Sequence, residues 1–263
     1  MDACDAARWW MMRSTSRNEA ETANCYVYCF CSGPAPEDGS LVGIGDSKVR
    51  TIQYDGVVAI VSDCYRPPEP SIPNAVAHNR VVSSILEATT PLPCRFGTTL
   101  SQRDLEIYVA SRSDAVKALL GRFQGCVEMT LRIAFGAEVP AGPFEDMTRA
   151  LPGELLPELR GPGARFLEEK MREANQQKLA NQQAQAVLDW VDDRFRHLVR
   201  DSVTRRYPET TLLGHISHLL DRARLRHYHE LLAAAQSDRP DLRLTISGPW
   251  APYSFAILDK STR

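Results

Sequence analysis

The sequence lacks any apolar run close to the roughly 18 residues that a membrane helix needs. It has no Cys-x-x-Cys pair and no Gly-x-x-x-x-Gly-Lys-Ser/Thr phosphate loop. Its net charge of -2 gives no general attraction to nucleic acid or to an anionic membrane. What remains is an ordinary soluble composition, with 43% hydrophobic and 24% charged residues over 263 positions. That length suits one large domain or two small ones.

The seven cysteines are an odd number and are scattered, and we see no secretory signal, so we expect a reduced, cytoplasmic protein. In CYVYCFC, period-two alternation places Cys25, Cys29 and Cys31 on one face of a strand and aromatic residues on the other. Three cysteines on one face could bind zinc. Metal sites, however, usually draw their cysteines from turns, and cysteines in an apolar strand behave as small buried hydrophobes. We therefore predict no metal site.

The first half of the chain reads as a mixture of strands and helices. The strand at 25–31 is apolar on both faces, which predicts a central strand covered on both sides. Asp55-Gly56 lies between two strand-like runs and predicts a hairpin. A helix is expected to start at Asn74 as its own cap, with His78, Val82 and Ile85 on one face. Further elements expected are short helices over 102–110 and 113–123 and a half-buried strand over 126–135.

A proline- and glycine-rich stretch over 136–163 predicts a linker, and a long helix follows over 164–200. This helix would be about 55 Å long, and its apolar seam starts at Leu167, is interrupted by amides and resumes at Ala184. Strands are expected at 201–207, 212–220 and 242–248, with a helix capped at Asp221 before the last.

With the strand at 126–135 placed first, the second half has the order β-α-β-β-α-β of a ferredoxin-like motif. The fold class is α+β with two domains. The expected division is a mostly unstructured extension (1–23), an N-terminal α+β domain (24–136), a linker (137–163), a C-terminal ferredoxin-like domain (164–258) that shares the strand 126–135, and a tail (259–263).

Two alternative activities have some support in the residues. Arg95 could lower the pKa of the neighbouring Cys94 thiol, and His78 could serve as its base, although no third group is apparent to orient the histidine. Between Arg194 and His229, eight arginines face three acidic residues and could meet RNA or an acidic protein surface. No stacking aromatics are interleaved with these arginines, so a solvated face with ion pairs is the simpler interpretation.

The segment SGPWAPYSF, over 247–255, combines two prolines with three large aromatic residues. Pro249 and Pro252 fix the backbone on either side of Trp250, which reduces the entropy lost on ordering. Trp250, Tyr253 and Phe255 can each bury about 150–250 Å². We therefore expect this segment to pack back across the C-terminal sheet or between the domains, shaping a surface rather than performing a reaction.

The stretch LTISGPWAPYSFA resembles the closing signature of the gas vesicle GvpL/GvpF family, in which a strand runs into Gly-Pro-Trp-x-Pro-Tyr-x-Phe. A helix bearing His78, followed by PLPCRFGTTL, is similar to that family's histidine helix and Leu-Pro-x-Arg-Phe-Gly-Thr segment. The resemblance covers about residues 24–258. It marks as structural or partner-binding positions His78, Arg95, Phe96, Gly97, Gly248, Pro249, Trp250, Pro252, Tyr253 and Phe255.

The resemblance implies a minor component or assembly factor of gas vesicles, the gas-filled protein shells built mainly from GvpA. It implies GvpA and other Gvp accessory proteins as partners, a cytoplasmic, vesicle-associated location, two α+β domains and no enzymatic activity, cofactor, nucleic acid or membrane. Cys94 departs from the larger apolar residue usual in that slot, and Trp9-Trp10 lies outside the pattern.

Overall fold

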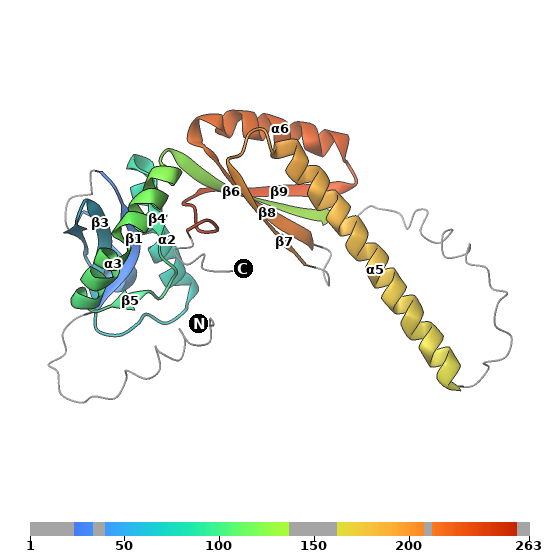
Figure 1. Ribbon diagram of the computed structural model, residues 1–263, viewed down its shortest axis with the longest axis horizontal. Helices are drawn as coiled ribbons and strands as arrows, with labels where there is room; N and C mark the ends of the chain where they lie inside the picture. The colour runs from blue at the N-terminus through green and yellow to red at the C-terminus, as the bar shows by residue number, and fades with distance from the viewer. Residues whose placement is uncertain (1–23, 34–39, 137–161, 208–211, 257–263) are drawn as a thin grey trace.

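The computed structural model describes residues 24–33, 40–136, 162–207 and 212–256, which form two antiparallel sheets with helices packed against them (Figure 1). We call residues 24–123 the N-terminal half and residues 126–256 the C-terminal half. The strands of the N-terminal half lie in the order β2-β3-β1-β4, and β5 also pairs with β1. Its elements are β1 (Asn24–Cys31), η1 (Ile44–Asp46), β2 (Val49–Tyr54), β3 (Val57–Cys64), α2 (Ile72–Ala88), β4 (Leu92–Pro93), β5 (Thr99–Leu100) and α3 (Gln102–Phe123).

Strand β1 is covered on both faces, because α2 and α3 pack against opposite sides of the sheet. Cys25 and Val27 belong to a core cluster that includes α3, whereas Tyr26 belongs to a cluster that includes α2. Every side chain from Cys25 to Cys31 is at most 2% exposed. The prediction of a central strand buried on both sides is confirmed.

A β-bulge in β1 changes which side chains share a face. The register with β3 shifts between Val27 and Cys29, so Cys29 and Cys31 join the α2 side, while Cys25 stays on the α3 side. The predicted common face of three cysteines is therefore wrong, since period-two alternation assumes an uninterrupted ladder.

The predicted hairpin is confirmed at Asp55 and Gly56, whose φ angles of 46° and 78° are the left-handed values of a type I′ turn. Helix α2 begins earlier than predicted, because its N-cap is Ser71 and not Asn74. The Ser71 hydroxyl accepts the Asn74 backbone N–H at 3.3 Å. Pro73 has no N–H to leave unpaired, so it fits inside the first turn.

Helix α3 is one continuous helix, and the predicted break near residue 111 is wrong. The hydroxyl of Ser111 donates to the Tyr108 carbonyl at 3.0 Å, so the serine is satisfied within the helix. Ser113 instead reaches the hairpin and donates to the Asp55 carboxylate at 3.0 Å. Neither serine needs to end the helix, and no proline or glycine lies between them.

The C-terminal half contains a sheet in the order β7-β8-β6-β9, with α5 and α6 packed on the same face around Leu131, Leu188 and Tyr228. Its element order agrees with the predicted β-α-β-β-α-β. Several boundaries differ from prediction: α5 spans Pro162–Phe195, β9 continues to Trp250, and α6 follows a 3-10 turn that Asp221 does not cap. The elements are β6 (Cys126–Phe135), α5 (Pro162–Phe195), β7 (Asp201–Arg206), β8 (Leu212–Asp221), η3 (Arg222–Arg224), α6 (Leu225–Asp238) and β9 (Leu242–Trp250).

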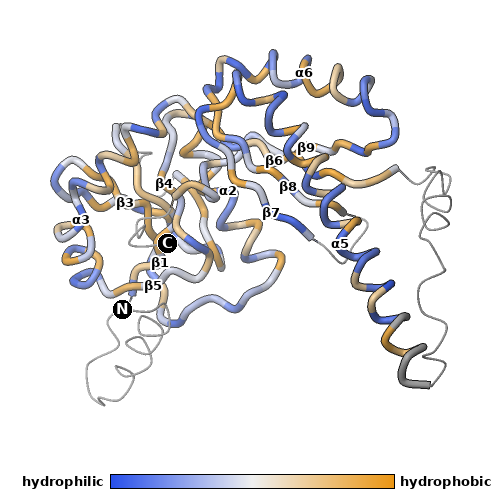
Figure 2. The backbone as a smooth tube through the Cα atoms, turned by 45° about the vertical axis from the view of Figure 1, so that its right-hand side comes forward, coloured by the Kyte–Doolittle hydropathy of each residue, from blue (hydrophilic) through white to orange (hydrophobic). Residues whose placement is uncertain are grey.

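The first part of α5 extends beyond the sheet, as Figures 1 and 2 show. Leu167 and Met171 are 61% and 58% exposed, whereas Leu188 and Phe195 near the other end are at most 1% exposed. The predicted apolar seam is therefore buried only where α5 packs on the sheet, and its first residues are exposed.

The predicted extension at 1–23, nearly all of the linker at 137–163 and the tail at 259–263 lie outside the described residues. Within the described ranges, no helix combines the length and the apolar character that a membrane span requires.

Candidate functional site

Residues 251–256, which we call the tail segment, follow β9 and pack between the two halves (Figure 1). Ala251 is 3% exposed and lies with Tyr253 against the cluster beside α2. Phe255 is 7% exposed and lies in the cluster beside α3. The prediction that the closing motif packs back between the two parts of the chain is confirmed.

A buried carboxylate anchors the tail segment to the second sheet. Glu128 is 4% exposed and accepts two hydrogen bonds from Ser254, one from the backbone N–H at 2.8 Å and one from the hydroxyl at 2.6 Å. The Ser254 hydroxyl also lies 3.0 Å from the Ser217 hydroxyl. A buried charge is costly unless such bonds replace its hydration, so Glu128 and Ser254 depend on each other.

The start of the closing motif requires a glycine. Gly248 has a φ of 128°, and a Cβ added there would lie 2.8 Å from both the Glu128 carbonyl oxygen and the Met129 sulfur. The following peptide to Pro249 is cis. Trp250 ends β9 opposite Glu128 and is half-buried, with its indole N–H 3.4 Å from the Ser247 hydroxyl.

A group of rings from four separate segments meets beneath the tail segment, and we call it the aromatic cluster. His78 lies at its centre, with the ring centroids of its neighbours 5.6–6.4 Å away. The cluster consists of Tyr26 and Tyr28 from β1, His78 from α2, Phe96 from the loop after β4, and Tyr253 from the tail segment. The two sequence motifs, far apart along the chain, are thus in direct contact.

The hydrogen bonds of the cluster connect His78 to β1 and to the loop after β4. The backbone N–H of Gly97 donates to the Tyr26 hydroxyl at 3.2 Å, and that hydroxyl lies 2.8 Å from His78 Nδ1. The Tyr26 hydroxyl donates to Nδ1 in the tautomer whose proton is on Nε2, and it accepts from Nδ1 in the other tautomer. The other ring nitrogen, Nε2, is buried and forms no hydrogen bond among the described residues.

Burial disfavours the charged forms of both residues in the proposed cysteine nucleophile. It lowers the pKa of His78 to about 4, an effect that the Cys94 backbone offsets in part. Burial raises the pKa of the Cys94 thiol to about 12, with no compensating effect from Arg95. A reactive cysteine needs the opposite shift, so the geometry gives no support to Cys94 as a nucleophile.

The remaining residues of the first motif lie at the edge of the cluster. The Arg95 carbonyl accepts from the Thr98 N–H and from its hydroxyl, at 3.2 and 2.7 Å, which closes the turn before β5. Gly97 supplies a φ of 88° within that turn. The Arg95 side chain is exposed and has no ion-pair partner in the described part of the chain.

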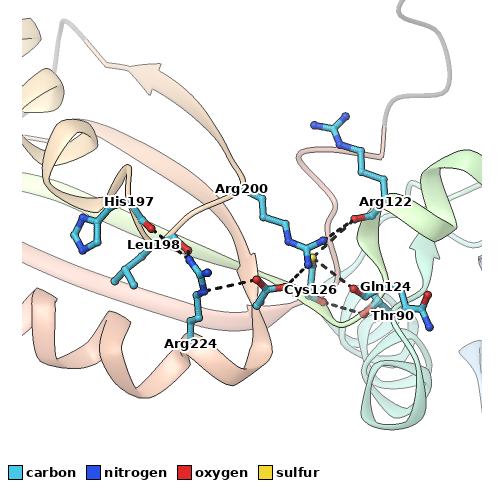
Figure 3. Close-up of polar contacts among 9 residues, drawn as sticks. Thr90, Arg122, Gln124, Cys126, His197, Leu198, Arg200 and Arg224 are labelled. Atoms are coloured by element: carbon cyan, nitrogen blue, oxygen red, sulfur yellow. Dashed lines mark hydrogen bonds and ion pairs between the residues drawn. The ribbon is translucent and has the colours of Figure 1, made fainter.

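Polar contacts join the two halves beside the tail segment (Figure 3). The Thr90 hydroxyl donates to the Cys126 carbonyl at 2.9 Å, and Arg200 donates to the Arg122 carbonyl at 3.3 Å. Arg122 also pairs with Asp201 at 2.6 Å. These contacts hold the segment after α2 against the start of β6, and the end of α3 against the start of β7.

Most arginines of the predicted basic region are paired. Arg200 and Arg224 both contact Asp221, at 2.5 and 3.7 Å. Arg194 pairs with Asp238 and Arg226 with Glu230 across or along the helices, Arg196 pairs with Asp192 and Asp193, and Arg222 donates to the Leu86 carbonyl. The interpretation as a solvated, ion-paired face therefore fits these positions, with Arg205 and Arg206 as exceptions.

The two histidines of β8 lie on opposite faces of the sheet. His218 is fully buried under α5, with Nδ1 2.8 Å from the Tyr228 hydroxyl and Nε2 3.9 Å from Asp192. His215 lies on the other face beside Tyr207. In the part of the chain that the structure describes, no group of three or more His, Cys, Asp or Glu side chains is arranged to hold a metal ion.

A family profile described as "Gas vesicle synthesis protein GvpL/GvpF" matches residues 24–257. The chain belongs to the GvpL/GvpF family. It is 28% identical to gas vesicle protein L1 of Halobacterium salinarum, over 92% of this chain and 94% of that protein. It is 25% identical to gas vesicle protein L of a Streptomyces species, over 88% and 92%.

Two solved structures share the fold of this GvpL/GvpF protein. The crystal structure of GvpF from Anabaena has a TM-score of 0.70 at 16% identity and covers 92% of this chain and 99% of that chain. GvpF from Microcystis aeruginosa has a TM-score of 0.70 at 19% identity, over 90% and 100%. The likeness confirms a mixed α and β fold with antiparallel sheets.

Sequence reasoning missed the polar partners that hold the GvpL/GvpF motifs in place. The sequence predicts Tyr26 only as part of the aromatic face of a strand. In the structure its hydroxyl is hydrogen-bonded to His78, 52 residues away. Glu128 is assigned to the polar face of a half-buried strand, with no sign of its contact to Ser254, 126 residues later. The signal in the sequence was Ser254, a hydroxyl placed between two large aromatic residues, which needs a polar partner where those residues pack.

Proposed function

We propose that the protein is a non-enzymatic gas vesicle accessory or minor structural protein. It binds the shell protein GvpA or other Gvp accessory proteins during assembly, in the cytoplasm and at the vesicle. Family membership over residues 24–257 supports a role in gas vesicle formation. The specific partners and the absence of catalysis are part of the proposal.

The observation that carries this proposal is how the GvpL/GvpF motifs are used. His78, Tyr253 and Phe255 lie in packed clusters that join the two halves. The lowered pKa of His78 makes it a weak base, and the raised pKa of Cys94 keeps its thiol protonated. The residues that identify the chain as a member of its family therefore pack its fold. A protein whose distinctive residues pack the fold is suited to binding other proteins.

We also propose that the two halves are domains, the second a ferredoxin-like variant. The order β7-β8-β6-β9 and the placement of α5 and α6 on one face support this division. In this proposal the N-terminal domain spans 24–136, the linker 137–163 and the C-terminal domain 164–258, with β6 shared between them. The structural or partner-binding residues are those of the two motifs, from His78 to Gly97 and from Gly248 to Phe255.

The exposed part of α5 is the surface we assign to an apolar Gvp partner. Phe166, Leu167 and Met171 are 62%, 61% and 58% exposed, and they lie where the helix has left the sheet. Exposed large apolar side chains grouped in this way mark interaction surfaces more often than isolated ones do. An apolar partner such as a shell protein would remove them from water.

The test is co-purification of the tagged protein with GvpA and the accessory proteins from cells that make gas vesicles. We expect Leu167→Glu/Met171→Glu to reduce the retained Gvp proteins at least tenfold, because two charges would enter an apolar contact. The matched control is Ile72→Glu/Ile107→Glu, which changes two apolar residues that are 82% and 56% exposed in the N-terminal half.

The proposal fails if the unmodified protein retains neither GvpA nor any accessory protein and deletion of its gene leaves vesicles normal. Equal loss in the test and control variants would instead reject α5 as the contact surface. Circular dichroism of each variant checks that the fold is retained.

A further inference from the structure

One face of the second sheet carries no helix, and the tail segment covers only part of it. Side chains on this face become more exposed with distance from the tail segment. In the covered row, Leu219 and Glu128 are neighbours across β8 and β6 and are at most 4% exposed. In the next row, Ser217 is buried and Thr130 is half-buried. One row further, Arg132 and Arg205 are exposed. The free part of the face is therefore the end of the sheet farthest from the N-terminal half.

That exposed row carries positive charge across the sheet, and we call it the basic row. Arg205 on β7 pairs in register with His215 on β8, His215 with Arg132 on β6, and Arg132 with Thr245 on β9. Arg243, also exposed, lies on β9 beside the row. None of these three arginines has an ion-pair partner within the described ranges.

This arrangement is unfavourable for a sheet left alone. Like charges on neighbouring strands of one face destabilise the pairing, and two arginines flank a single histidine here. Burial lowers the pKa of His215, and the positive charges of Arg205 and Arg132 lower it further, an effect that Glu128 offsets in part. Elsewhere in the C-terminal half, Arg200 and Arg239 each have a carboxylate partner. The basic row is thus a place where an incoming anion would be stabilised.

We propose that the basic row, Arg205, His215, Arg132 and Thr245 with Arg243 beside it, binds an acidic segment of a partner protein. Arg132 and Arg205 are two strands apart, about 10 Å at the backbone, so carboxylates of one segment can reach both. Each guanidinium can hold a carboxylate through two parallel hydrogen bonds. The Thr245 hydroxyl, exposed at the end of the row, can donate a further one.

The side chains on the central strands favour protein carboxylates over RNA. Four-stranded sheets that bind RNA stack its bases on aromatic side chains of the sheet. In the basic row and the row before it, the side chains of β6 and β8 that are not buried are Thr130, Arg132 and His215, with no Phe, Tyr or Trp among them, and the ring of His215 already contacts that of Tyr207 at a centroid distance of 5.4 Å. Tyr207, at the edge, is hydrogen-bonded to His215 through its hydroxyl at 2.9 Å.

The inference rests on the proposed function for the statement that the partner is a protein, but its test needs no gas vesicle component. The probe is a fluorescent peptide of alternating glutamate and alanine, titrated with the full-length protein and followed by anisotropy. A peptide with glutamine in place of glutamate and an oligouridine of similar length are the comparison probes. We expect the glutamate peptide to bind, the glutamine peptide not to bind, and affinity to fall as salt is added.

The decisive variant is Arg132→Gln/Arg205→Gln, and its matched control is Arg66→Gln/Arg103→Gln. Both remove two exposed positive charges, so they have the same net charge. We expect the dissociation constant of the glutamate peptide to rise about five- to thirtyfold in the first variant and less than twofold in the control. Arg132→Lys/Arg205→Lys should retain most of the binding through charge alone.

Equal weakening in the two glutamine variants would show a general charge effect and overturn the proposal. So would absence of glutamate-peptide binding, tighter binding of oligouridine, or self-association of the chain through the same arginines. If the peptide fails while Gvp proteins still co-purify, this inference is wrong and the proposed function stands. If the peptide binds and no Gvp protein co-purifies, this inference stands and the proposed function is wrong.

Discussion

The buried histidine of the aromatic cluster should make the folded state sensitive to mild acid. The pKa of His78 falls from an ordinary value near 6.5 to about 4 because burial disfavours the imidazolium ion. Between these values the unfolded chain binds a proton that the folded chain does not. Stability from this residue is therefore complete above about pH 6.5 and is lost as the pH falls toward 4. The loss amounts to about 2 kcal/mol at pH 5 and about 3 kcal/mol at pH 4.

The measurement is urea unfolding of the unmodified protein and of His78→Gln at several pH values between 7.5 and about 4.5, followed by circular dichroism. Glutamine can still accept the Tyr26 hydroxyl bond and cannot titrate. We expect His78→Gln to be less stable at pH 7.5, because it fills the cluster less well, but to show a shallower decline with acid. His227→Gln, at an exposed position on α6, is the matched control.

Two results would refute the reasoning. One is a difference between His78→Gln and the unmodified protein that stays constant across the pH range, which would mean that His78 does not titrate differently in the two states. The other is a decline that is equally shallow in His227→Gln, which would assign the effect to general charge repulsion at low pH.

Three further outcomes follow from contacts at the same site. Gly248→Ala should destabilise by about 2–4 kcal/mol in urea unfolding, because its Cβ would clash with the Glu128 carbonyl at an unfavourable φ; stability within error of the parent would contradict this. Tyr26→Phe should cost about 1–3 kcal/mol, since it strands His78 Nδ1, whereas Tyr253→Phe should change stability by less than about 1 kcal/mol because its hydroxyl has no partner among the described residues; the reverse order would be inconsistent with the geometry. Iodoacetamide should modify Cys94 in the folded protein at least about tenfold more slowly than free cysteine at pH 8, as mass spectrometry can show, given its raised pKa; fast modification would revive the nucleophile hypothesis.

The strands and the hairpin were predictable because their signals are local. The turn at Asp55-Gly56 depends on neighbours in sequence and is confirmed. The alternation of β6 holds over residues 130–134, whereas residues 126–129 are all buried. The bulge near Tyr28 was not predictable, because an extra residue in one strand is defined by its partner strand. The same reason explains the wrong face for Cys29 and Cys31.

The predicted helix boundaries were wrong where a residue that suits a cap has another role in the structure. Asn74 is a good cap by composition, but Ser71 takes that place because a proline can sit inside the first turn. Asp221 is also a good cap by composition, yet its carboxylate contacts Arg200 and Arg224 instead. Such competition is settled by tertiary contacts, which one sequence does not display.

At the candidate site, the motifs identified the residues but not their partners. His78 and Tyr253 belong to separate motifs, and their contact could be expected only as packing of the closing segment. The contributions of Tyr26 and Glu128 come from strands assigned on periodicity, which says which way a side chain points but not what it meets. Polar pairing across long sequence separations is what the sequence left undetermined.

The position of the tail segment has a consequence for how the protein is made. Ala251, Tyr253 and Phe255 complete core clusters whose other members are mostly in the N-terminal half. A ribosome translates that half first, yet its cores stay unfinished until these late residues have emerged from the exit tunnel. A nascent chain stalled before Gly248 would expose an open aromatic cluster around His78, a surface that chaperones recognise.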